Sequence, residues 1–305
     1  MCAAPLPGTM LPTLILVGLM FGAGSLLART GIFPDTAADT LNRFVVYVAL
    51  PALVLHAVPK LELEPGLIAL VVVPWLTLAA GALACLGAAR AFGWSRGVLG
   101  ALLLCVPIGN TSFLGLPLLD ALRGPEAVHY GIVYDQAGSF LILSTYGLVV
   151  LARYSGSTPP TAATLLLRVL SFPPFIALVL ALLPIAWPEE LDSVFDRVGA
   201  TLVPLAMFAV GMRLRLRPPA ERSALVAGLA IKMLLMPLCA VGIVRALDTR
   251  GLVAEVAVLE AAMPPMLTAA SLAQLAGLAP ELCAALAGYG IALAFVIVPL
   301  WAALQ

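Results

Sequence analysis

Charged side chains are scarce in this sequence. Only 10% of its 305 residues are Asp, Glu, Lys or Arg, whereas an ordinary soluble domain contains about 25%. The 16 basic and 16 acidic residues cancel, so the composition gives no sign of a nucleic-acid partner or of a polybasic lipid-binding patch. A soluble fold of this length could not cover its surface with so few charges, and we therefore exclude an ordinary soluble domain.

Motifs of metal, cofactor and catalytic sites are missing as well. The cysteines are scattered without a C-x-x-C spacing, which leaves no firm metal site and favours a packing role for them. The sequence has no H-E-x-x-H or G-x-S-x-G pattern and no Walker-type loop. We therefore expect no cofactor and no enzyme activity, and an intramembrane enzyme is the least favoured class of function.

Apolar residues make up 62% of the chain instead. A membrane-spanning helix needs about 20 consecutive apolar residues, and ten such runs follow one another, separated by charged residues, Gly or Pro. We expect an all-α membrane protein with ten transmembrane helices embedded in a lipid bilayer. Their expected positions are about 10–28, 38–58, 66–89, 96–121, 127–152, 162–184, 195–212, 223–246, 253–277 and 281–303.

The distribution of Lys and Arg predicts the orientation of these helices. Residues 1–9 carry no Lys or Arg, unlike the basic start of a signal peptide, so the first run is interpreted as a retained helix. With the N-terminus outside, the cytoplasmic side holds about twice as many Lys and Arg residues as the outer side. The positive-inside rule thus favours a multi-pass protein with both termini outside.

Two segments of the chain repeat one pattern. Residues 51–65 and 204–218 each begin with a proline inside an apolar run, place a basic residue nine positions later and end on a proline fourteen positions after the first. The first segment ends L-E-L-E-P and the second L-R-L-R-P. In two halves of five helices the same loop falls on opposite sides of the membrane, and the positive-inside rule selects Arg in one copy only. Unless the similarity is due to chance, the chain is an inverted repeat with halves 1–154 and 161–305.

The fourth and ninth expected helices are interrupted at corresponding places, V-P-I-G-N-T at 106–111 and M-P-P-M-L-T at 263–268. Proline removes an amide donor and clashes with the carbonyl four residues earlier, and backbone groups freed in this way cannot face lipid. Unless the prolines only kink the helices, the two breaks form the solute site of a transporter. The candidate substrate-binding residues are Pro107, Ile108, Gly109, Asn110, Thr111, Pro264, Pro265 and Thr268.

Ionisable residues inside the spans are the second group of candidates, because buried charges in a membrane usually face a cavity or a partner. Asp135 could bind a cation, carry a coupling proton or accept hydrogen bonds from a broken helix. Glu260, one turn before the ninth-helix break, is a cation or proton site unless it lies in water near the outer surface. Lys232 either pairs with one of these carboxylates or attracts a substrate carboxylate. The full set of candidates for the coupling ion or proton is Asp135, Glu260, Lys232, Tyr134 and Ser139.

At four places the chain resembles the auxin efflux carrier family, which includes plant auxin carriers and bacterial organic-acid carriers. The matching stretches are Y-V-A-L-P-A-L from Tyr47, G-N-T-S-F-L-G-L-P-L-L from Gly109, the pair Y-D at Tyr134, and L-E-A-A-M-P-P from Leu259. The second stretch is quite specific, and the order and spacing fit over essentially the whole chain. Because there is no long central cytoplasmic loop, the sequence is similar to the compact bacterial form.

The resemblance implies a fold and a mechanism. It implies two inverted five-helix halves whose broken helices 4 and 9 cross, as in the related bile-acid carriers. Helices 1, 2, 6 and 7 would form a scaffold domain that joins two chains in a homodimer, and helices 3–5 and 8–10 a mobile transport, or crossover, domain. A bacterial member of this family would lie in the inner membrane and move an organic anion by elevator-type alternating access.

The sequence therefore favours a secondary active transporter of a small organic anion, a carboxylate, acting by symport or export. An uncoupled facilitator or channel-like protein with the same helices is one alternative, and a sodium-coupled symporter of another small solute is a second. The coupling ion is open between sodium and a proton, since the broken helices select the type of charge but not the molecule.

Overall fold

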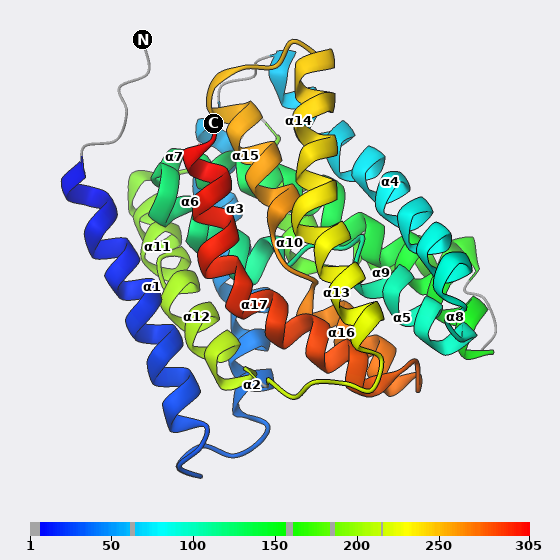
Figure 1. Cartoon of the computed structure of the whole chain (residues 1–305). Coiled ribbons are helices and arrows are strands. Elements are labelled where there is room, and N and C mark those ends of the chain that lie inside the picture. Colours follow the sequence, from blue (N-terminus) through cyan, green and yellow to red (C-terminus); the bar gives the residue numbers. More distant parts are fainter. Residues whose placement is uncertain (1–6, 62–64, 157–160, 184–186, 215) are drawn as a thin grey trace. The chain divides into compact units, whose positions relative to one another are not determined.

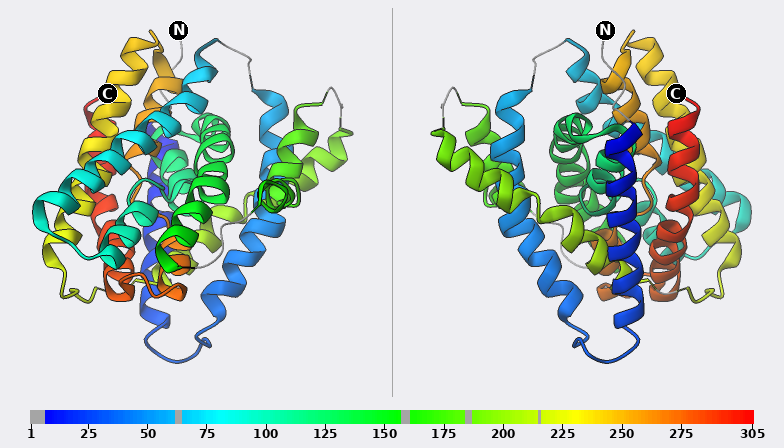
Figure 2. Two further views of the ribbon diagram at one scale, coloured as in Figure 1. Left: turned by 90° about the vertical axis from the view of Figure 1, so that its right-hand side faces the viewer. Right: turned by 90° about the vertical axis from the view of Figure 1, so that its left-hand side faces the viewer.

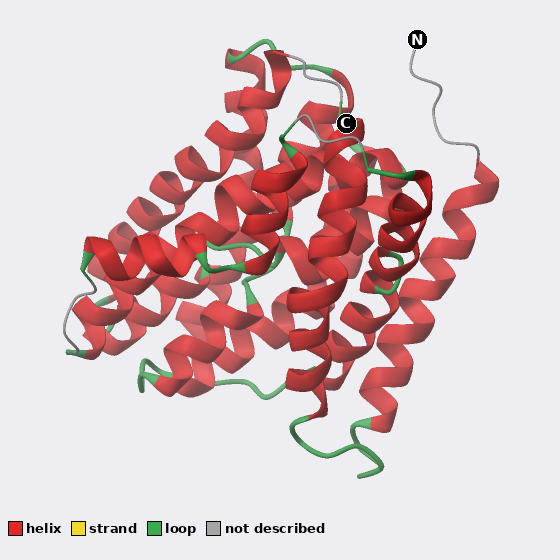
Figure 3. Ribbon diagram, turned by 180° about the vertical axis from the view of Figure 1, so that it is seen from behind, coloured by secondary structure: helices red, strands yellow, loops and turns green. Residues whose placement is uncertain are grey.

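The structure is a computed structural model that describes residues 7–61, 65–156, 161–183, 187–214 and 216–305. Every regular element within these ranges is a helix (Figure 3), so the predicted all-α class is confirmed for the described part of the chain. The helices pack into two compact units. Unit 1 comprises 1–64, 112–136 and 167–214, and unit 2 comprises 65–111, 137–166 and 215–305.

Six helices of the described part are long and apolar enough to cross a membrane. They are Ala37–Lys60, Ile68–Phe92, Pro125–Ser155, Glu189–Met212, Arg222–Ala246 and Pro280–Ala303. Shorter apolar helices also occur, at Pro12–Leu27 and Arg96–Cys105. Length and composition therefore make the chain a multi-pass membrane protein.

Unit 1 is built from the first helices of the chain together with segments from its middle. Its elements are α1 (Pro7–Leu27), α2 (Ala37–Phe44), η1 (Val45–Ala49), α3 (Leu50–Ala57), η2 (Val58–Lys60), most of η4 (Thr111–Gly115), α6 (Leu116–Arg123), α7 (Pro125–Tyr134), the end of α9 (Ala162–Leu170), α10 (Pro173–Ala181), α11 (Glu189–Gly199) and α12 (Leu202–Met212). The stretch from Ala37 to Lys60 is helical throughout, and both views of Figure 2 show it as one unbroken, bent ribbon.

Close helix contact in unit 1 depends on small residues. Helices α1 and α12 lie side by side (Figure 1). A Cβ atom on Gly24 would collide with the backbone carbonyl of Phe208, and one on Gly211 with that of Phe21. Glycine at these two positions therefore lets the backbones touch, which is how membrane helices gain packing energy where lipid removes the usual hydrophobic drive.

Unit 2 holds the remaining helices. They are η3 (Pro65–Leu67), α4 (Ile68–Phe92), α5 (Arg96–Cys105), most of η5 (Asp135–Phe140), η6 (Leu143–Gly147), α8 (Leu148–Ser155), α13 (Arg222–Ala230), η7 (Ile231–Leu235), α14 (Met236–Ala246), α15 (Gly251–Ala262), α16 (Leu267–Leu275) and α17 (Pro280–Ala303). Helices α4, α14 and α15 pack against one another, and α5 packs against α8, α16 and α17.

Several π-helical segments of the chain precede a proline. Segment η1 ends two residues before Pro51, η4 two residues before Pro117 and η7 two residues before Pro237. A proline ring clashes with the carbonyl four residues earlier in a regular α-helix. The wider turn of a π-bulge removes that clash and lets these helices continue through their prolines.

Two expected helices differ from the structure. The sixth was expected to be continuous, but it is divided into α9 and α10 because Phe172 precedes Pro173 and takes an extended backbone, with ψ of 117°. The seventh was expected to begin near residue 195, after an acidic loop. It begins at Glu189, because acidic side chains such as Glu190 and Asp192 are favourable in the first turn of a helix.

Candidate functional site

The two predicted interruptions are present, and they meet within unit 2. Helix α5 ends at Cys105 and α15 ends at Ala262. The amide of Asn110 donates to the Pro264 carbonyl at 2.8 Å, and the amide of Met266 donates to the Ile108 carbonyl at 2.9 Å. Figure 1 shows the second break as the extended orange stretch between α15 and α16. Each break thus provides hydrogen-bond partners for backbone groups of the other. We call this pair of breaks the crossing.

Proline chemistry explains why the second helix stops where it does. Met263, which precedes Pro264, has an extended backbone with ψ of 146°, as the residue before a proline prefers. Met266 is extended too, with ψ of 127°, and is the residue before α16 begins. The Gly109–Pro265 pair forms an isolated antiparallel bridge. The crossing is therefore a short sheet-like contact inside a helical unit.

Seven of the eight candidate substrate-binding residues are buried, and one is not. Pro107, Ile108, Gly109, Asn110, Thr111, Pro264 and Pro265 are buried. Thr268 was predicted to lie in the second break, but it is in the first turn of α16 and its side chain is exposed. Because α16 already begins at Leu267, the break is two residues shorter than the sequence pattern indicated.

Asn110 is the most unusual polar residue of the crossing. Its side chain is 0% exposed, and within the described part of the chain neither its Oδ1 nor its Nδ2 atom has a hydrogen-bond partner. Leaving a buried polar group unsatisfied costs about 1–3 kcal/mol. An amide offers both a donor and an acceptor, so the Asn110 side chain can exchange hydrogen bonds with a polar ligand.

Lys232 brings a positive charge to the same place. It lies in η7, its side chain is 1% exposed, and its Nζ donates to the Ala261 carbonyl at 3.1 Å. A Cβ built on Gly109 would be 3.2 Å from that Nζ and 3.5 Å from the Glu260 carbonyl oxygen. Because Ala261 is in the last turn of α15, the ammonium also faces the negative end of a helix dipole.

The side chain of Glu260 is buried and not exposed to solvent. The sequence left open whether it lies in water near the outer surface, but its side chain is 0% exposed and lies in the last turn of α15. Its carboxylate interacts electrostatically with Lys232. A carboxylate and an ammonium therefore accompany the crossing inside unit 2.

Asp135 belongs to a separate polar cluster in unit 1. Its side chain is 1% exposed; Ser112 Oγ donates to Oδ1 at 2.6 Å, and Gln136 Nε2 donates to Oδ2 at 2.8 Å. The sequence singled out Tyr134 and Ser139 as neighbours, and both are buried. Ser112 was not predicted to be part of a site, although it directly follows the first break and therefore could have been found from its position.

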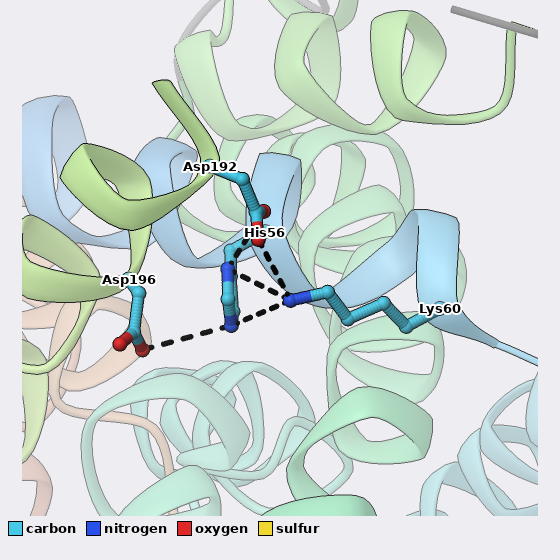
Figure 4. Close-up of polar contacts among 4 residues, drawn as sticks. All are labelled: His56, Lys60, Asp192 and Asp196. Atoms are coloured by element: carbon cyan, nitrogen blue, oxygen red, sulfur yellow. Dashed lines mark hydrogen bonds and ion pairs between the residues drawn. The ribbon is translucent and has the colours of Figure 1, made fainter. Parts of the chain in front are cut away.

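A third polar cluster joins α3 to α11 in unit 1 (Figure 4). His56 Nδ1 lies 2.8 Å from Asp192 Oδ1, and Lys60 Nζ donates to Asp192 Oδ2 at 3.1 Å. The Lys60 ammonium also lies 3.0 Å from His56 Nε2, while Asp196 is 3.6 Å from the same ring nitrogen. The side chains are partly exposed, which is typical of a structural contact at the end of a helix.

The family of the chain follows from comparison with known proteins. The sequence profile of a family described as "Membrane transport protein" matches residues 9–302. The chain belongs to this family. It is the auxin efflux carrier family that the G-N-T-S-F-L-G-L-P stretch resembles, and the chain is thus a membrane transporter.

Individual relatives agree with this assignment. An "Uncharacterized transporter" of Methanothermobacter thermautotrophicus is 32% identical over 302 residues, covering 96% of each chain. Another uncharacterized transporter, from Methanocaldococcus jannaschii, is 26% identical and covers 77% of this chain and 79% of its own. A protein of Rhizobium meliloti named "Putative malonate transporter" is 29% identical, over 72% of this chain and 71% of its own.

Proposed function

We propose that this member of the family is a secondary active transporter of a small organic anion that binds at the crossing. The observation that carries the proposal is the buried Asn110 side chain, which has no hydrogen-bond partner in the described part of the chain although it lies between two broken helices. Such a residue is costly in an apolar unit unless a polar solute binds there in part of the cycle. Broken helices in a transporter mark the solute site for the same reason.

Charge supports a carboxylate as the substrate. Lys232 is fully buried beside Gly109, where the missing side chain leaves its ammonium close to the backbone of the first break. An ammonium donates three hydrogen bonds, and the one to Ala261 leaves others for a carboxylate. The relative from Rhizobium meliloti named for malonate supports the same class of solute.

Coupling is proposed to pass through the buried acidic groups. Asp135, with Ser112 and Gln136 as hydrogen-bond donors, and Glu260, in electrostatic contact with Lys232, are the carboxylates that sodium or a proton would bind. Tyr134 and Ser139 are the further candidates. Hard cations take oxygen ligands, whereas a proton needs only one carboxylate, so an ion-replacement experiment separates the two.

The same proposal includes the architecture that such a carrier needs. Ten helices in two inverted halves, 1–154 and 161–305, would place both termini outside the inner membrane. Helices 1, 2, 6 and 7 would form a scaffold that pairs in a homodimer, and helices 3–5 and 8–10 would move as an elevator. The charge swap between L-E-L-E-P and L-R-L-R-P supports the inversion, and the paired breaks support helices 4 and 9 as partners.

The test uses the full chain in proteoliposomes with radiolabelled malonate as the first probe and a panel of other carboxylates as competitors. We expect uphill accumulation when a sodium or proton gradient is imposed, and a loss of about tenfold or more in Asn110→Ala. Ser271→Ala, in α16 after the same helix break, is the control and should transport normally, because the Ser271 hydroxyl donates to the Leu267 carbonyl of its own helix. Equilibration without accumulation would make the protein a facilitator, and normal uptake by Asn110→Ala would remove the crossing as the site.

A further inference from the structure

The π-helical segment that carries Lys232 leaves one carbonyl without its usual donor. In η7 the Met236 amide donates to Ile231, the five-residue spacing of a π turn. The next residue, Pro237, has no amide hydrogen, so the Met233 carbonyl lacks the donor that an α-helix would supply four residues later. Met233 is 0% exposed, and a buried carbonyl without a donor is costly in a membrane.

A tryptophan from another helix supplies a donor to that carbonyl. The indole Nε1 of Trp301, on α17, donates to Met233 O at 3.0 Å. Indole can only donate a hydrogen bond, so it matches an acceptor that lacks one. Tryptophans that merely anchor a protein at the membrane interface direct the N–H group towards water or lipid headgroups. In Trp301 the N–H group is used inside unit 2 instead.

Met233 directly follows Lys232, so the hydrogen bond from Trp301 to Met233 O also affects the position of Lys232 beside the crossing. The Met233 carbonyl belongs to the Met233–Leu234 peptide, in the same π-helical segment as Lys232. A change in the backbone of this segment would redirect the Cα–Cβ bond of Lys232 and move its ammonium. There is little room for such a movement, since the Nζ lies 3.1 Å from Ala261 O and close to Gly109. The hydrogen bond from Trp301 therefore fixes the turn on which the position of the ammonium depends.

The same arrangement occurs at a second buried ionisable residue. Trp75, on α4, donates its indole Nε1 to the Ala137 carbonyl at 3.0 Å, and Ala137 lies in the π-helical segment η5, two residues after Asp135. A Cβ on the next residue, Gly138, would lie only 2.5 Å from Pro74. Lys232 and Asp135 thus each lie in a π-helical segment in which a tryptophan N–H group donates to a backbone carbonyl.

We propose that Trp301 is a positioning residue for Lys232, and that Trp75 has the same role for the turn that bears Asp135. The proposal rests on the proposed function, because it gives Lys232 and Asp135 their importance. It adds that the indole N–H groups, rather than the aromatic rings, set the geometry of the transport site. Neither tryptophan is assigned a contact with the solute.

The first experiment reports on Lys232 itself and does not require a substrate. The chain has two lysines, Lys60 and Lys232, so protein labelled with ¹³C at the lysine ε carbon gives two resolvable signals in detergent, assigned with Lys60→Arg. We expect Trp301→Phe, which keeps a ring but removes the N–H group, to shift the Lys232 signal. Trp94→Phe is the matched control, since the Trp94 indole donates to Ser223 Oγ and not to a π turn. An unchanged Lys232 signal in folded Trp301→Phe would overturn the proposal.

A second variant tests whether the N–H group acts through the Met233 carbonyl. Pro237→Ala returns an amide donor at the position where an α-helix would supply it. In that background we expect Trp301→Phe to shift the Lys232 signal less than it does in the wild type. An equal shift in both backgrounds would show that the tryptophan acts in another way. If Trp301→Phe does not fold, indole hydrogen exchange in the wild type decides: the Trp301 N–H group should exchange far more slowly than that of Trp94, and equal exchange rates would contradict the proposal.

Transport kinetics then connect the position to the function. Loss of one hydrogen bond is expected to raise the KM for malonate about three- to tenfold in Trp301→Phe with a smaller effect on the maximal rate, while Trp94→Phe keeps both values. A fall in maximal rate at constant KM would indicate a structural role only. If the wild type transports no carboxylate, the proposed function fails, and the lysine signals still decide whether Trp301 positions Lys232.

Discussion

The ammonium of Lys232 donates to the backbone carbonyl of Ala261 at 3.1 Å, at the point where α15 ends. The buried lysine thus donates a hydrogen bond to the backbone at the end of a broken helix, in addition to its electrostatic interaction with the Glu260 side chain. The contact links three features that the sequence shows separately: an intramembrane cation, a helix break at Pro264 and a carboxylate, Glu260, one turn before that break. Each of the three can be changed by a separate substitution.

The first prediction separates the stability role of Lys232 from its transport role. Lys232→Met removes a cation that interacts electrostatically with the buried Glu260 carboxylate, and removing one partner of a buried charge pair costs about 3–5 kcal/mol. We expect a clear fall in melting temperature together with loss of carboxylate uptake. In Lys232→Met/Glu260→Gln the uncompensated charge is gone, so the melting temperature should recover while uptake stays lost.

Thermal unfolding in detergent and malonate uptake in proteoliposomes check this prediction side by side. Recovery of both stability and uptake in the double variant would mean that Lys232 serves only to neutralise Glu260. Failure of the melting temperature to recover would mean that Lys232 stabilises the unit through Ala261 rather than through the charge pair.

The second prediction concerns the space at Gly109. A methyl group there would lie 3.2 Å from Lys232 Nζ and 3.4 Å from the Cγ2 atom of Thr111. The lysine end is flexible, so Gly109→Ala should fold with only a modest loss of stability, on the order of 1 kcal/mol. It should nevertheless weaken uptake severalfold, because the ammonium must move away from the first break.

Gly18→Ala is the matched control for this substitution. A Cβ at Gly18 on α1 would meet nothing within 4 Å, and alanine is the better helix former by about 1 kcal/mol. We expect normal uptake and equal or higher stability in Gly18→Ala. If the two variants lose uptake equally, the effect of Gly109→Ala is not local to the crossing.

The sequence was sufficient to predict the breaks but not the contacts across them. Pro107 with Gly109 and the pair Pro264–Pro265 each place two helix-breaking residues close together, so these interruptions follow from local chemistry. The hydrogen bond from Asn110 to Pro264 joins residues far apart in the chain, and no local pattern specifies it. The bond from Trp301 to Met233 could not be predicted for the same reason.

One further difference from expectation has a signal in the sequence, and others have none. Phe172 precedes Pro173, and a residue in that position is biased away from the helical backbone, so the division between α9 and α10 had a signal. The prolines at 51, 117 and 237 each follow a π-helical segment, but nothing in the sequence distinguishes a π turn from a kink. The depth of Glu260 depends on tertiary packing, which only the structure supplies.

The third prediction concerns the cluster at the end of α3. Asp192 contacts both His56 and Lys60, whereas Asp196 lies 3.6 Å from one ring nitrogen and is more exposed, at 63% against 32% for the two side chains. Partly exposed ion pairs contribute about 0–1 kcal/mol. We expect Asp192→Asn to lower the melting temperature by a few degrees at most, and Asp196→Asn to lower it less.

Neither substitution should change malonate uptake, because the contacts of this cluster hold α11 against α3 within unit 1. Melting curves recorded at low and high salt check the assignment, since a partly exposed pair weakens as salt rises. A large uptake defect in Asp192→Asn would instead give this cluster a part in the transport cycle.

The fourth prediction tests the hydrogen bonds to Asp135. Ser112 Oγ donates to its carboxylate at 2.6 Å, and a hydrogen bond to a charged group contributes about 1.5–3 kcal/mol. Ser112→Ala removes this donor at almost constant shape, so we expect uptake driven by an imposed ion gradient to fall about tenfold or more. Ser271→Ala is the control, because the Ser271 hydroxyl donates to a carbonyl of its own helix, that of Leu267.

Counterflow, the exchange of labelled for unlabelled malonate without a gradient, tells apart the two ways in which Ser112→Ala could fail. If Asp135 carries the coupling ion, exchange should persist in Ser112→Ala while gradient-driven accumulation is lost, since exchange does not require net movement of the ion. If both are lost together, Ser112 and Asp135 support the solute site directly. If neither changes, the carboxylate of Asp135 is a structural acceptor, and the coupling ion must bind at Glu260 or elsewhere.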